Sequence, residues 1–243
     1  MERIIKTAKL IVAVAATTIA ASAFAGPVNV DYTGTGAGQN VKITVGSSTY
    51  NVFAGQLKHT LSGATGADAV WNGTYRTFCT DLSQGVVSGV DSFDIVDLTS
   101  MPDSSPMGAT KANAIKDMFA YTTNSVTTSG ASNNLATAFQ LAVWEIVKDF
   151  NTASANNGLS ITSGSLRTKA SDGSALSSGI TSILTNLLAV AGTGIYSNTT
   201  DIEIKGISND CAQDQIITRV VPAPGMAGLG LIGGLAMARR RNR

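Results

Sequence analysis

One stretch of the sequence, residues 135–150, constrains the fold more than any other. It reads Leu-Ala-Thr-Ala-Phe-Gln-Leu-Ala-Val-Trp-Glu-Ile-Val-Lys-Asp-Phe, with apolar residues at helical spacing. Together they form a broad stripe for burial against a core, made of Leu135, Phe139, Ala142, Val143, Ile146 and Phe150. We therefore expect a central helix here, capped at its start by Ser132, Asn133 or Asn134.

A polar side chain, Gln140, lies on the shoulder of this stripe. It is about 100° round the helix from Phe139 and one turn before Trp144, so we expect its carboxamide to be at least half buried. A buried amide without hydrogen bonds costs about 1–3 kcal/mol, so its usual partners are hydrogen-bonding groups. A rarer fate is attack by a cysteine thiol, which displaces ammonia and leaves an intramolecular thioester. Cys79, in an apolar-flanked segment upstream, is the candidate thiol.

The composition describes a compact chain of low charge. Its 243 residues are 44% hydrophobic and 14% charged, with a net charge of +1, which is enough apolar material for the core of one domain. The charged fraction is well below the usual quarter, a balance typical of exported or surface proteins. The body has no cluster of basic residues, which argues against nucleic acid as a partner.

Residues 1–25 have the three parts of a secretory signal peptide. Three basic side chains in the first nine residues precede an apolar run at 10–21, and Ala-Phe-Ala at 23–25 fits the cleavage site. We expect the mature chain to begin at Gly26 and to be secreted or displayed on the cell surface.

The first part of the body, residues 28–100, carries strand patterns. Alternating and β-rich residues on either side of a Gly-Ser-Ser turn predict a hairpin over 41–55. An Asn-Gly turn signal separates 69–71 from 74–79 and predicts a second hairpin, which puts Cys79 at the end of a strand.

Helical patterns follow in the middle of the body, and strand patterns return at its end. The predicted helices lie within a lobe at 105–190 and span 110–121, 135–150 and 178–190. The final strand region is 195–220, with predicted strands at 195–196 and 202–207 and a last one at 215–221 that ends one residue beyond it. This order predicts an α+β body over 26–220, with a β-barrel-like or sandwich-like sheet built from N- and C-terminal strands and a helical lobe inserted in the middle.

The last segment, residues 221–243, is unlike the body. Pro222 and Pro224 precede thirteen apolar and glycine residues, and arginines close the chain, among them Arg239, Arg240 and Arg241. The apolar run is about 20 Å long as a helix, so flanking residues must help it to cross a membrane core of about 30 Å. The arginines would stay cytoplasmic and leave the body outside the inner membrane.

This tail resembles PEP-CTERM sorting domains, which combine a proline-flanked motif, a short hydrophobic segment and a terminal arginine cluster. The resemblance implies a Gram-negative bacterium that makes exopolysaccharide, a transient inner-membrane intermediate and an exosortase-type protease as a partner. One position departs from the family pattern, because Ala223 stands where the family has an acidic residue.

Hydrolase and metal chemistry find little support. His59 is the only histidine, and no Gly-x-Ser-x-Gly motif supplies a nucleophile for it. Two cysteines and one histidine do not make a structural zinc site, and Asp81 and Glu145 would work as a carboxylate pair only at a defined separation. We expect no enzyme, no metal and no cofactor.

Cys79 remains, with two alternative partners. An even cysteine count in an exported chain ordinarily means a disulfide, here between Cys79 and Cys211, in a passive structural or matrix protein. Gln140 is the other partner, as the acyl group of a thioester.

The second alternative is supported by a resemblance. Residues 78–81, Phe-Cys-Thr-Asp, and the later Phe-Gln-Leu-Ala-Val-Trp around Gln140 are similar to the paired motifs of thioester-forming domains of bacterial surface adhesins. The resemblance implies that Cys79 is the thiol, that Gln140 is the acyl donor, and that Phe78, Asp81 and Trp144 surround the bond. It also implies covalent attachment to a surface amine or hydroxyl, with exopolysaccharide as one candidate acceptor.

Overall fold

The computed structural model describes residues 26–102, 104–198 and 201–221. The predicted signal peptide and the sorting residues Pro222, Pro224, Arg239, Arg240 and Arg241 lie outside these ranges. No helix within the described ranges is long and apolar enough to cross a membrane.

Six antiparallel strands close into a barrel. Their neighbours run in the order β2-β3-β7-β6-β4-β1, and a long β1–β2 pairing joins the two ends of this order. A seventh strand, β5 (Leu166–Ala170), extends the sheet by pairing with residues 41–45 at the C-terminal end of β1. The bounds of the six are β1 Val28–Val45, β2 Ser48–Ser62, β3 Gly73–Cys79, β4 Val90–Val96, β6 Ile202–Asn209 and β7 Ala212–Val220.

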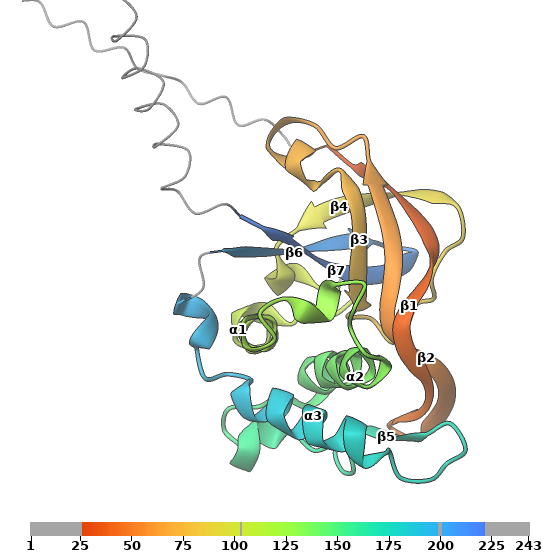
Figure 1. Ribbon diagram of the computed structural model, residues 1–243, viewed down its shortest axis with the longest axis vertical. Helices are drawn as coiled ribbons and strands as arrows, with labels where there is room; N and C mark the ends of the chain where they lie inside the picture. The colour runs from red at the N-terminus through yellow and green to blue at the C-terminus, as the bar shows by residue number, and fades with distance from the viewer. Residues whose placement is uncertain (1–25, 103, 199–200, 222–243) are drawn as a thin grey trace, which may run out of the picture.

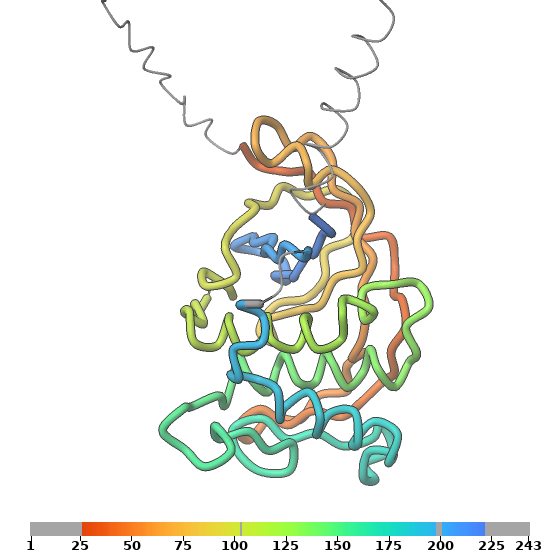
Figure 2. The backbone as a smooth tube through the Cα atoms, turned by 60° about the vertical axis from the view of Figure 1, so that its left-hand side comes forward, coloured from red at the N-terminus to blue at the C-terminus, as the bar shows by residue number. Residues whose placement is uncertain are grey.

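The C-terminal strands rejoin the N-terminal ones. In Figure 2 the blue β6 and β7 lie between the orange and yellow N-terminal strands, and Cys79 at the end of β3 is paired with Gln215 of β7. The predicted α+β fold, with a barrel-like sheet from both ends of the chain, is confirmed.

Three helices pack below the barrel in Figure 1. They are α1 (Gly108–Tyr121), α2 (Asn133–Asp149) and α3 (Ser178–Val190). Ser132, one of the predicted caps, precedes helix α2, and its hydroxyl accepts a hydrogen bond from the Leu135 amide. It contacts β1, β2 and β3 on one side and α1 and α3 on the other. Every residue from 136 to 147 is buried, so α2 is covered on all its faces and not along a single stripe.

The buried apolar side chains form two clusters. One fills the barrel around Trp71 and Phe93, and the larger one lies between the sheet and the helices and contains α2. Cys79 belongs to the larger cluster, so the end of β3 faces the helical layer.

Two predicted elements are wrong, and the strand β5 was not predicted. The predicted Asn-Gly hairpin is absent because residues before Asn72 form a 3₁₀ helix, η1 (Gly66–Trp71), and β3 pairs with β2 instead. The Asn72 side chain bridges the amide and carbonyl of Ala64, which stabilises this longer connection. The predicted strand at 195–196 is part of a 3₁₀ helix, η5 (Ile195–Asn198).

Candidate functional site

Gln140 binds the main chain of Cys79 with both ends of its carboxamide. The Cys79 amide donates to Gln140 Oε1 at 2.9 Å, and Gln140 Nε2 donates to the Cys79 carbonyl at 2.8 Å. Both residues are at most 2% exposed, so the predicted burial of Gln140 is confirmed and nearly complete. Two hydrogen bonds in a dry environment fix the plane and position of this carboxamide.

The barrel leaves room for Gln140 because two strands separate at this point. The β2–β3 pairing ends at Leu57 and Thr77, two residues before Cys79. On the other side of β3, the Thr80 amide donates to the carbonyl of Asp214 in β7. The Gln140 carboxamide from α2 therefore takes the position that the next β2 residue would occupy beside Cys79.

Aromatic packing holds α2 in this register against β3. Phe78 and Phe139, the residues directly before Cys79 and Gln140, have ring centroids 4.8 Å apart. Phe119 of α1 completes the cluster, 4.6 Å from Phe139 and 6.4 Å from Phe78. All three rings are fully buried, so a slide of α2 along β3 would break several aromatic contacts at once.

The Cys79 sulfur lies in a tight turn formed by the next two residues. The thiol donates to the Asp81 carbonyl at 2.6 Å, and the Asp81 amide donates to the sulfur at 3.2 Å. The Asp81 carboxylate accepts two hydrogen bonds from Ser83, through the amide and the hydroxyl, which closes the loop after β3. Asp81 thus shapes the loop that holds the sulfur.

Burial raises the pKa of the Cys79 thiol, and it outweighs every other influence. The nearby Trp144 indole N–H and the hydrogen bonds of the Asp81 main chain act in the opposite direction, while the charges of Asp81 and Asp214 add to the increase. Cys79 is therefore a neutral thiol at neutral pH, and its proton must leave during any nucleophilic attack.

One of the two hydrogen bonds polarises the Gln140 carboxamide. The Cys79 amide polarises the C=O bond through its hydrogen bond to Oε1, as a donor in an oxyanion hole does. Trp144, one turn after Gln140 and 3% exposed, helps to cover the site.

The alternative Cys79–Cys211 disulfide is not formed. Both cysteines are free, Cys79 buried and Cys211 exposed. Cys211 precedes β7 by one residue and Cys79 faces Gln215, four residues further on. Four residues of strand extend about 13 Å, whereas disulfide-bonded Cα atoms lie about 4.4–6.8 Å apart.

The other titratable residues considered from the sequence have structural partners. His59 is buried, its Nδ1 lies 2.9 Å from the Thr77 hydroxyl, and burial lowers its pKa to about 4. Glu145 accepts a hydrogen bond from the Ser160 amide, and Asp81 accepts one from the Ser83 amide, so the two carboxylates bind different loops. The described residues contain no cluster of side chains suited to a metal ion.

Three residues of the site were not found from the sequence. Gln213 donates to the Asp81 carbonyl, Gln215 donates to Gln213, and Thr80 lies fully buried beside Cys79. The signal that was available is Gln215 in an apolar strand, because an isolated amide among buried residues needs a polar partner.

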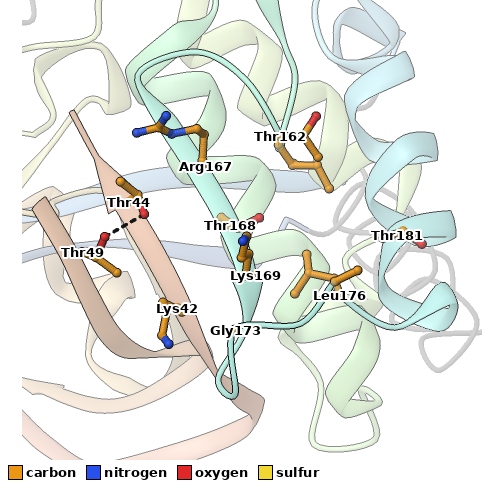
Figure 3. A pocket seen from close by; sticks show the side chains of 12 residues that line it. Lys42, Thr44, Thr49, Thr162, Arg167, Thr168, Lys169, Gly173, Leu176 and Thr181 are labelled. Carbon is orange, nitrogen blue, oxygen red and sulfur yellow. Dashed lines mark hydrogen bonds between the residues drawn. The ribbon is translucent and has the colours of Figure 1, made fainter. Parts of the chain in front are cut away.

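A cavity of about 710 Å³ lies elsewhere in the molecule. It is beside β5, with Lys42, Arg167 and Lys169 among its lining residues (Figure 3). Arg167 donates to the Gly46 carbonyl, and the hydroxyls of Thr44 and Thr49 bond each other. None of its lining residues belongs to the Cys79–Gln140 site.

No known protein family and no curated protein matches this chain. Among solved structures, the chain is similar to the N-terminal domain of the Streptococcus pyogenes pilus tip adhesin Cpa, at 13% sequence identity and a TM-score of 0.39. The match covers 74% of this chain and 94% of that one. At this level of likeness, the chemistry has to be inferred from the residues of the site.

Proposed function

We propose that this chain is an exported surface or matrix protein that attaches itself covalently through a thioester between Cys79 and Gln140. The observation that carries the proposal is the pair of hydrogen bonds between the Gln140 carboxamide and the Cys79 main chain inside a dry core. These bonds hold the carboxamide at the residue that carries the thiol, and well-oriented intramolecular reactions reach effective molarities of about 10⁵ M or more.

Thioester formation is balanced without a co-reactant. The bond between Cys79 Sγ and Gln140 Cδ forms, the Cδ–Nε2 bond breaks, and the thiol proton leaves with the nitrogen as ammonia. Attachment follows when an amine or hydroxyl of the acceptor attacks Cδ and Cys79 is released as a thiol. Each molecule reacts once, so this is covalent capture and not turnover.

The proposal includes export and sorting. The signal peptide would carry the body across the inner membrane, and an exosortase-type protease would process the tail at 221–243 before release or anchoring. The acceptor would be an amine or hydroxyl at the cell surface or in the exopolysaccharide matrix.

Intact-mass measurement of the mature protein tests the thioester. We expect a mass lower than that of the sequence by one ammonia, lost in both Cys79→Ala and Gln140→Ala. The matched control Cys211→Ala should keep the deficit, because Cys211 is exposed and free. A wild-type mass equal to the sequence mass would contradict the thioester.

A further inference from the structure

Two buried polar atoms at the Cys79 site make no hydrogen bond. They are Trp144 Nε1 and Thr80 Oγ1, two of the six such side-chain atoms in the described ranges. A buried donor without an acceptor costs about 1–3 kcal/mol and calls for an explanation. Thr80 follows Cys79 in the chain and Trp144 follows Gln140 by one helical turn, which suggests that the site provides hydrogen bonds that the resting state does not use.

Trp144 is the better placed of the two. It lies one turn after Gln140 on α2 and is 3% exposed, so its indole N–H has no access to water. Gln140, one turn earlier on the same helix, bonds the Cys79 main chain, which brings the Trp144 ring to the Cys79 site. There the buried indole N–H makes no hydrogen bond, and it lowers the pKa of the Cys79 thiol. An N–H in this place interacts more strongly with a charged sulfur than with a neutral thiol.

We propose that the Trp144 indole N–H donates a hydrogen bond to the Cys79 sulfur as negative charge develops on it, which makes Trp144 a catalytic residue of thioester formation and opening. This inference rests on the proposed function and deepens it, because it assigns chemistry to a side chain that would otherwise only cover the bond.

The two donors of the site then serve the two atoms that become negative. When an amine attacks Gln140 Cδ, the new C–N bond forms, the Cδ–Sγ bond breaks, and the electron pair of that bond moves to the sulfur. The Cys79 amide stabilises the charge on Oε1 of the tetrahedral intermediate. Trp144 stabilises the departing sulfur until it takes up the proton that the amine loses. Formation uses the same contacts in reverse order.

Trp144→Phe separates this role from covering, because phenylalanine keeps an aromatic ring and removes the N–H. Trp71→Phe is the matched control, since Trp71 is 2% exposed and lies in the other core cluster. Both variants are made in a Cys211→Ser background, in which Cys79 is the sole thiol.

The first measurement is the rate of thioester opening by methylamine, followed by thiol release and intact mass. A hydrogen bond to a charged group predicts that Trp144→Phe slows opening about tenfold to a hundredfold, with Trp71→Phe unchanged. If Trp144 only excludes water and reagents, opening in Trp144→Phe will be as fast as in the parent or faster, and the proposal is overturned.

The second measurement does not need the thioester. In a Gln140→Ala, Cys211→Ser protein Cys79 stays a thiol, and its alkylation by iodoacetamide across the alkaline range follows the thiolate fraction. We expect Trp144→Phe to lower this rate about threefold to tenfold, because the higher intrinsic nucleophilicity of a more basic thiolate offsets part of the loss. An unchanged or faster rate overturns the role of Trp144, whereas a missing ammonia deficit in the wild type contradicts the thioester alone.

A second substitution guards against misfolding of Trp144→Phe. Benzothienylalanine replaces the indole nitrogen by sulfur and keeps the shape of the side chain, and a Trp71→Phe background restricts it to position 144. The same fall in alkylation rate is expected. A rate equal to that of the tryptophan protein would overturn the proposal.

Discussion

At the scale of single residues, Gln140 has a structural task as well as a chemical one. It pairs with the amide and the carbonyl of Cys79 where β2 no longer reaches β3. The helical spacing around Phe139 predicted that Gln140 would be buried, and the local strand pattern predicted that Cys79 would end a strand. The sequence offered Gln215 as an isolated amide in an apolar strand, but it could not place Gln213 and Gln215 beside Cys79. They belong to a distant strand, and Gln213 is 132 residues from Asp81, to which it donates a hydrogen bond.

The contribution of Gln140 to the free energy of unfolding can be measured in a variant that cannot form the thioester. Removing Gln140 from a Cys79→Ala protein leaves the amide and the carbonyl of residue 79 buried and unpaired. We expect the free energy of unfolding of Cys79→Ala/Gln140→Ala, measured by urea denaturation, to be about 2–5 kcal/mol lower than that of Cys79→Ala. The control Gln39→Ala in the same background removes a part-buried bond to Asn134 and should cost below about 1 kcal/mol. A loss no larger than that of the control would contradict the structural role.

At the scale of elements, the long periodic segments were predicted well and the short polar ones were not. The helix pattern at 135–150 became α2, shifted by two residues at its start to the Ser132 cap. Strand β5 was missed because its arginine and lysine alternate with one leucine and one threonine after a Ser/Gly loop, and pairing with β1 makes it a strand. The Asn-Gly signal at residue 72 marked a chain reversal correctly but not its partners, because β3 pairs with β2 across η1.

Helix α2 is tied to the next loop by a buried acid, which predicts a pH dependence of stability. Glu145 accepts a hydrogen bond from the Ser160 amide at 2.6 Å, while its other oxygen is buried without a hydrogen bond. Burial raises the Glu145 pKa from 4.5 to about 8, with a smaller contribution in the same direction from Asp149. The native state therefore holds a proton that the unfolded state releases, so this residue makes stability fall as pH rises from about 4.5 to 8.

Glu145→Gln should remove this slope, because glutamine keeps the acceptor oxygen and does not ionise. We expect the variant to be more stable than the wild type by about 1–3 kcal/mol at the upper end of the window, and to lose that advantage at the lower end. Urea denaturation of both proteins across the window measures the difference. His59 titrates in both proteins, so its effect cancels in the comparison. A difference that does not change with pH would refute the assignment.

At the scale of the whole molecule, the site lies where the two halves of the fold meet. Cys79 comes from the barrel and Gln140 from the helical lobe, and β7 pairs with β3 beside them. The return of the C-terminal strands to the N-terminal sheet was predicted from the order of strand and helix patterns. Closure through the β1–β2 pairing was not, because closure depends on strand tilt and register, which no local pattern encodes.

A bond between Cys79 and Gln140 would also cross-link the chain, which leads to a prediction for global stability. The two residues are 61 positions apart, so the bond closes a long loop and restricts the unfolded state. The loop-closure relation used for disulfides gives about 4 kcal/mol for a loop of this size. We expect the free energy of unfolding of wild-type protein opened by methylamine to be lower than that of closed protein by about this amount. Urea denaturation measures the difference, and the mass of each sample verifies its thioester state. Methylamine should leave the stability of Gln140→Ala unchanged, since that variant has no loop to open. Equal urea midpoints for closed and opened protein would mean that Cys79 and Gln140 are not covalently joined or that the unfolded chain already holds them together.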